Sequence, residues 1–111
     1  MTSDLFAPAA RRELRAALIW IAKDNQAAAE ALLVAALHSA RRIATRPALG
    51  RLRTELLPAP YRFWRVTSFP YLLVYNATRL PPRVLRFVHM ARDLGPLLAG
   101  LAVPDDESPA G

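Results

Sequence analysis

The sequence contains no cysteine, and this absence excludes disulfide bonds and thiolate metal sites. Lysine is almost absent too, because Lys23 is the only one and arginine carries nearly all of the positive charge. The longest apolar stretch, Ala27 to Leu37, is interrupted by Glu30 and is too short to span a bilayer. No basic segment followed by an apolar run opens the chain, so no secretory signal is visible. These absences predict a soluble, cytoplasmic protein with no membrane contact, no metal and no cofactor.

What is present fits one compact domain, because the chain has 111 residues of which 53% are hydrophobic. We expect this domain to cover residues 1–103 and the acidic tail, residues 104–111, to be disordered. The formal net charge is +6. A GC-rich genome would explain arginine in place of lysine, but it does not explain the net charge. Guanidinium groups pair well with phosphate and carboxylate, so a nucleic acid or an acidic protein is the expected kind of partner.

The N-terminal half predicts a short strand at Leu5-Phe6 followed by two helices. Pro8 suits a first helical turn, and residues 9–24 show an apolar stripe at helical spacing. Asp24-Asn25 has helix-capping chemistry, and a second helix is expected over residues 26–44. The many alanines allow close approach, so the two helices should form an antiparallel hairpin.

The C-terminal half predicts three antiparallel strands, at Tyr61 to Thr67, Tyr71 to Ala77 and Arg83 to Met90. Prolines mark the turns and the connector before the sheet. The expected fold is therefore α+β, with the helical hairpin packed on one face of a small twisted sheet and the other face open to partners. The apolar segment from Leu94 to Leu101 either docks a partner or packs on the sheet.

Three stretches, taken together, resemble the RelE/ParE superfamily of bacterial toxins. The connector Pro47-Ala48-Leu49-Gly50-Arg51 is similar to the loop before the sheet in that superfamily. Phe69-Pro70-Tyr71-Leu72-Leu73-Val74-Tyr75 looks like its central strand. The stretch from Val84 to Asp93 ends in His-x-x-Arg-Asp, as the last strand of ParE-type members does. The likeness extends from about Leu5 to Leu98 and includes the order of the elements.

The resemblance implies the toxin of a type II toxin–antitoxin pair, a system associated with plasmid stabilisation and growth inhibition. It implies a hetero-oligomer with a cognate antitoxin, which usually carries the operator-binding part. Two cellular targets are open: RelE-type toxins cut messenger RNA on the ribosome, and ParE-type toxins poison DNA gyrase. A basic RNA-binding module without toxicity is a third hypothesis.

Ribonuclease chemistry without a metal needs a proton acceptor, a proton donor and cations beside the phosphate. His89 is the candidate acid or base, and the cation candidates are Arg65, Arg86 and Arg92. Strand alternation argues against a single site, because Arg86 and His89 are three positions apart and should face opposite sides of a regular strand. Glu55, in the connector, is the only acidic candidate that the sequence places near the sheet.

The sequence offers few catalytic candidates, and it lacks the lysine cluster that is typical of RelE-type members. Both observations favour a ParE-like toxin that acts by binding. Structural explanations compete for most of these residues. The tyrosines of the central strand suit core packing, His89 suits a hydrogen-bonded strand end, and Arg92-Asp93 suits a local ion pair. The residues predicted to bind antitoxin or target are Tyr75, Arg92, Asp93, Leu94, Leu97 and Leu98.

Overall fold

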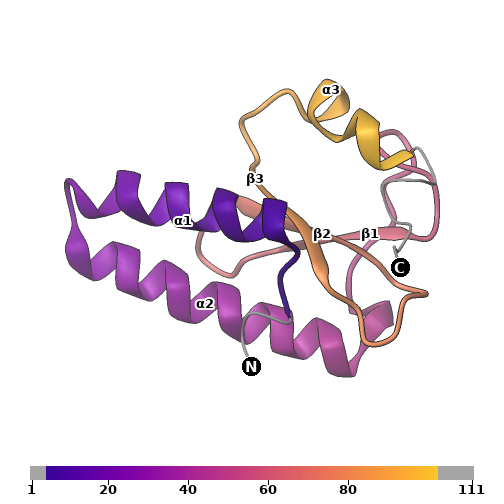
Figure 1. Cartoon of the computed structure of the whole chain (residues 1–111), viewed down its shortest axis with the longest axis horizontal. Coiled ribbons are helices and arrows are strands. Elements are labelled where there is room, and N and C mark those ends of the chain that lie inside the picture. The colour runs from indigo at the N-terminus through magenta and orange to yellow at the C-terminus, as the bar shows by residue number, and fades with distance from the viewer. Residues whose placement is uncertain (1–4, 103–111) are drawn as a thin grey trace.

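The computed structural model describes residues 5–102, and the predicted acidic tail lies outside this range. Helices α1 (Pro8–Ala22) and α2 (Gln26–Thr45) form the predicted hairpin, which Figure 1 shows lying along one side of the sheet. Pro8 occupies the first turn of α1. The Asn25 side chain accepts a hydrogen bond of 3.0 Å from the Ala28 N–H at the start of α2. No described helix combines the length and apolar character that crossing a membrane requires.

The sheet has three antiparallel strands in the order β1 (Tyr61–Arg65), β2 (Tyr71–Asn76) and β3 (Val84–His89). The short first strand predicted at Leu5-Phe6 is present as an isolated parallel bridge, in which Val84 bonds to Leu5 and Ala7 through 2.8 Å hydrogen bonds. Ser68 adopts a positive φ of 72° in the turn between β1 and β2. The register of β2 and β3 shifts between Val74 and Tyr75.

Apolar side chains cover both faces of this sheet, so the expectation of one open face is wrong. The helix face, which includes Tyr71, Leu73, Tyr75 and Phe87, packs against the hairpin. The connector face lies on the other side and packs against Leu57 and the short helix α3 (Leu94–Leu98). Its sheet residues are Tyr61, Phe63, Leu72, Val74, Leu85 and Val88. This double cover explains why all five residues from Tyr71 to Tyr75 are buried.

The side chain of Tyr75 is completely buried and links the sheet to the connector by hydrogen bonds. Its hydroxyl donates to the Pro47 carbonyl at 2.6 Å and accepts from the Gly50 N–H at 2.8 Å. Pro47 begins the 3-10 turn η2 (Pro47–Leu49), and a second 3-10 turn, η3 (Ala99–Ala102), follows α3. Gly50 leaves no room for a side chain, because a Cβ there would lie 2.7 Å from the Tyr75 hydroxyl.

Candidate functional site

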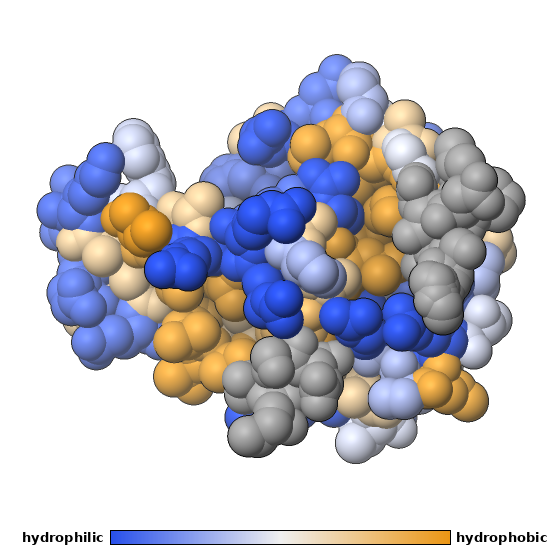
Figure 2. Space-filling model, in the orientation of Figure 1, coloured by the Kyte–Doolittle hydropathy of each residue, from blue (hydrophilic) through white to orange (hydrophobic). Residues whose placement is uncertain are grey.

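The candidate site is a pocket of about 230 Å³ between α1 and the end of the sheet, which we call the β3-end pocket. Figure 2 shows this side of the molecule hollowed between the hairpin and the lobe that carries α3. The helix contributes a wall of small residues with the exposed Trp20 at one end. The full lining is Glu13, Ala16, Ala17, Trp20, Tyr71, Phe87, Val88, His89 and Arg92.

His89 ends β3 on the helix face, because it pairs with Tyr71 of β2. Its ring stands edge-on to the Tyr71 ring, with centroids 5.0 Å apart, and Tyr71 stacks on Phe87 at 4.8 Å. The Nδ1 atom accepts a 3.0 Å hydrogen bond from the Ala91 N–H, so the neutral ring carries its proton on Nε2. Burial raises the pKa of Tyr71 still further above neutral pH.

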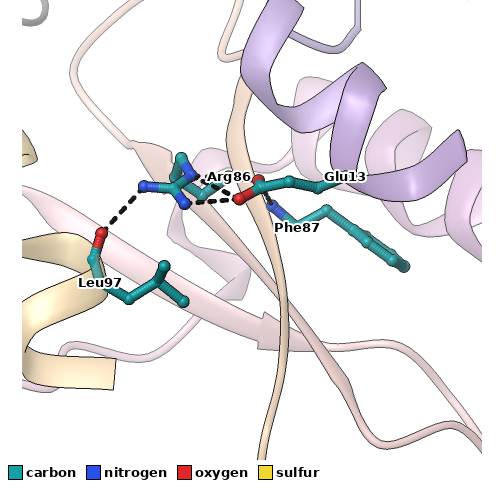
Figure 3. Close-up of polar contacts among 4 residues, drawn as sticks. All are labelled: Glu13, Arg86, Phe87 and Leu97. Atoms are coloured by element: carbon teal, nitrogen blue, oxygen red, sulfur yellow. Dashed lines mark hydrogen bonds and ion pairs between the residues drawn. The ribbon is translucent and has the colours of Figure 1, made fainter. Parts of the chain in front are cut away.

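Arg86, a predicted catalytic cation, is occupied by structural contacts (Figure 3). Its Nε lies 3.0 Å from both carboxylate oxygens of Glu13, and its Nη1 donates to the Leu97 carbonyl at 3.0 Å. The same carboxylate accepts a 2.9 Å hydrogen bond from the Phe87 N–H, on the outer edge of β3. Glu13 and Arg86 therefore join α1, β3 and α3, and their contacts leave Arg86 poorly placed to meet a substrate phosphate.

Arg65 lies on the opposite side of the sheet from His89. It pairs with Leu72, a connector-face residue, whereas His89 pairs with Tyr71 on the helix face. Two strand spacings, about 10 Å in all, also separate their backbones. The pairing from Arg86 to His89 is regular, so these two residues face opposite sides as the alternation predicted. The four catalytic candidates thus reduce to two in one place, His89 and Arg92.

Glu13 is an acidic residue that contacts the sheet directly, so the prediction that Glu55 is the only acidic candidate near the sheet is wrong. Glu55 is exposed and pairs with Arg53 at 3.0 Å. A backbone hydrogen bond and the Arg53 side chain lower the pKa of Glu55, which makes it a poor proton acceptor. One signal for Glu13 exists in the sequence: it is the only acid of α1 and directly precedes Leu14 of the apolar stripe.

The predicted binding residues divide into buried and exposed groups. Tyr75, Leu94 and Leu98 are buried, and Leu97 packs against the connector-face core, so α3 is a packing segment in this structure. Arg92 and Asp93 are exposed, and these two described residues form no ion pair with each other. Within residues 5–102, no group of three or more histidine, aspartate or glutamate side chains is placed to hold a metal ion.

The fold and the pocket together define a small α+β protein in which a helical hairpin packs on a three-stranded antiparallel sheet. The model of the family described as the ParE toxin of the type II toxin–antitoxin system, parDE, matches residues 5–94. The chain belongs to this family and is a toxin of a type II toxin–antitoxin system, which confirms the superfamily and the fold indicated by its sequence. Membership implies an antitoxin partner. No curated protein sequence matches the chain.

Proposed function

We propose that the protein arrests growth by binding DNA gyrase in the cytoplasm, and that a cognate antitoxin neutralises it by forming a complex. The observation that carries the binding mechanism is the dispersal of the catalytic candidates. Arg86 is held by Glu13, and Arg65 projects from the face opposite His89. A phosphoryl-transfer site needs several cations around one phosphate, and among residues 5–102 the pocket that holds His89 contains one arginine, Arg92.

The β3-end pocket is the surface that we assign to the target or the antitoxin. Trp20 is 69% exposed at one end of the pocket, and Arg92 contributes a cation. Met90, which is 39% exposed, follows His89 directly. Tryptophan and arginine are the residues most enriched among those that dominate binding energy at protein interfaces. An exposed tryptophan beside a concave surface therefore favours a protein partner.

A supercoiling assay with purified gyrase and the full-length toxin tests this proposal. We expect inhibition of supercoiling or accumulation of cleaved DNA, and we expect His89→Ala to retain the effect because no proton transfer is involved. Trp20→Ala should weaken inhibition about tenfold or more, as expected for an aromatic anchor. Val34→Ala is the matched control, since Val34 is 67% exposed on α2 and does not line the pocket.

Ribosome-dependent messenger cleavage is the second candidate, because His89, Tyr71 and Arg92 do share one pocket. Primer extension on messenger RNA after toxin expression separates the two functions. Cleavage that His89→Ala abolishes, together with gyrase that is unaffected at stoichiometric toxin, would replace the gyrase proposal by the ribonuclease.

A further inference from the structure

The positive charge of this protein is concentrated in one part of the chain. Residues 31–92 contain eleven arginines and a single acidic residue, Glu55, which is already paired with Arg53. One arginine of this stretch, Arg86, is neutralised by Glu13. Apart from Arg92, the arginines of this stretch that are not paired with an acidic residue do not line the β3-end pocket. A charge excess of this size calls for a polyanionic partner.

Three of these arginines lie on the two segments that meet at Trp64, which are the C-terminal end of α2 and strand β1. The Arg42 guanidinium lies over the Trp64 ring, 5.4 Å from its centroid, and Arg46 caps the C-terminus of α2 four residues later. Arg62 is two positions before Trp64 on β1, so both side chains project from the same side of the strand. We call this group, Arg42, Arg46, Arg62 and Trp64, the Trp64 surface.

Backbone and ring contacts hold two of these guanidinium groups in place. Arg62 Nη1 donates to the Gly50 carbonyl at 2.7 Å and contacts the Ala48 carbonyl at 3.5 Å, which leaves its other N–H groups for a ligand. The Trp64 indole N–H is buried without a hydrogen-bond partner. Phenylalanine would avoid that desolvation cost, but tryptophan gives the strongest cation–π contact to an arginine. The indole is therefore best explained as a platform for Arg42.

The chemistry of this surface fits phosphate groups on a duplex. None of its three arginines forms an ion pair with another residue in the described range 5–102. Protein interfaces bury exposed aromatic and apolar anchors at their centre, whereas the Trp64 ring of this surface is already covered by Arg42. Single-stranded nucleic acids require aromatic rings on which bases stack, but Arg42 already covers Trp64. Duplex DNA requires only cations that reach its phosphates.

We propose that the Trp64 surface binds the phosphate backbone of duplex DNA without reading its sequence. The proposal goes beyond the proposed function and does not depend on gyrase being the target. It also differs from operator recognition, which requires contacts to base edges.

Fluorescence anisotropy of a labelled 20-base-pair duplex, titrated with the full-length toxin at several salt concentrations, tests the proposal. For Arg42→Gln combined with Arg46→Gln, we expect the dissociation constant to rise about tenfold or more at low salt. The slope of log affinity against log salt should fall by about 2, because each lost phosphate contact removes about one unit. The effect should be the same for duplexes of unrelated sequence.

The matched control is Arg12→Gln combined with Arg15→Gln, which removes the same charge from α1. Arg12 lines a pocket together with Leu85 and Leu97, and that pocket includes no residue of the Trp64 surface. This control should leave the salt slope unchanged. In addition, Trp20→Phe leaves Trp64 as the only indole of the chain, and its emission should change as the duplex binds.

Equal losses in the two double variants would overturn the proposal, because binding would then follow net charge alone. Tighter binding of a single-stranded RNA of equal length, with the same dependence on Arg42 and Arg46, would also overturn it in favour of RNA. Displacement of the duplex by polyglutamate at equal charge concentration would overturn it in favour of an acidic protein partner. None of these outcomes bears on whether gyrase is inhibited, so the proposed function stands or fails separately.

Discussion

At the scale of single residues, the contact between Tyr75 and the connector explains how a proline-rich segment without regular structure is held in place. Gly50 is part of this contact because its backbone approaches both Tyr75 and the Phe63 carbonyl. A side chain at this position has no room, although its φ of −73° is ordinary for any residue. Steric space, rather than backbone conformation, therefore explains this glycine.

Gly50→Ala should lower the free energy of unfolding by about 1–3 kcal/mol, as overpacking of a well-filled core does. The new Cβ would lie 2.7 Å from the Tyr75 hydroxyl and 2.9 Å from the Phe63 carbonyl oxygen. Gly95→Ala is the control, because nothing lies within 4 Å of its Cβ position in α3. Urea denaturation of both variants measures the difference, and equal midpoints would contradict the explanation.

The buried tyrosines predict a loss of stability at high pH. Burial raises the pKa of Tyr75 and Tyr71 above the ordinary value of about 10. The unfolded chain therefore releases these phenolic protons at lower pH than the folded protein does. The stabilising contribution is complete below pH 10 and is lost as the pH rises through the folded pKa values.

Urea denaturation at pH 8 and pH 11 measures this loss. Tyr75→Phe should be less stable than the native protein at pH 8, by about 1–2 kcal/mol, because the Pro47 and Gly50 backbone groups lose their partner. It should also lose less stability between the two pH values. A loss as large as that of the native protein, in a variant with both Tyr71 and Tyr75 replaced by phenylalanine, would refute the assignment.

At the scale of the elements, Glu13 and Arg86 join three segments that are far apart in the sequence. Glu13 also accepts from a backbone N–H on the outer edge of β3, which has no strand partner there. The pair is only partly exposed, with 19% of the Arg86 side chain and 27% of the Glu13 side chain accessible. Such a pair contributes mainly by avoiding unpaired buried groups.

Glu13→Ala should therefore destabilise the protein by about 2–3 kcal/mol, because Arg86 and the Phe87 N–H both lose their acceptor. Glu30→Ala on the exposed side of α2 removes the same charge and should change stability by less than about 0.5 kcal/mol. Thermal and urea unfolding compare the two variants. Similar small effects would mean that Glu13 does not join the three segments.

The sequence predicts the two helices and three strands of this fold to within two residues at each end. Local signals are enough to predict where these elements begin and end, because Pro8, Asn25 and the prolines near the strands restrict the backbone of adjacent residues. The packing of other segments against the connector face cannot be predicted from such local signals. Leu57 reaches that face from the connector and Leu98 reaches it from α3, and no periodicity in the sequence indicates which surface they cover.

The candidate site is predicted only in part for a related reason. Alternation along the strands correctly separates Arg86 from His89, since it depends on one strand alone. The contacts of Glu13 and the neighbourhood of Arg42 and Trp64 join residues that are distant in the chain. Their side chains meet only after the hairpin has packed on the sheet, which a pattern within one segment cannot show.

At the scale of the whole molecule, the structure separates two surfaces of different chemistry. The β3-end pocket combines an exposed tryptophan with His89 and Arg92, and the Trp64 surface consists of arginines around a covered indole. The first suits a protein partner and the second suits a polyanion. A toxin that binds gyrase while gyrase holds DNA would have a use for both surfaces.

The most direct test of the central claim is a pulse of toxin expression in a bacterial host that carries a DNA-damage reporter and lacks the antitoxin gene. We predict growth arrest with a strong reporter signal, retained in His89→Ala, because a poisoned gyrase leaves broken DNA. Growth arrest with a silent reporter, lost in His89→Ala and accompanied by cleaved messenger RNA, would contradict the account and identify the protein as a ribonuclease.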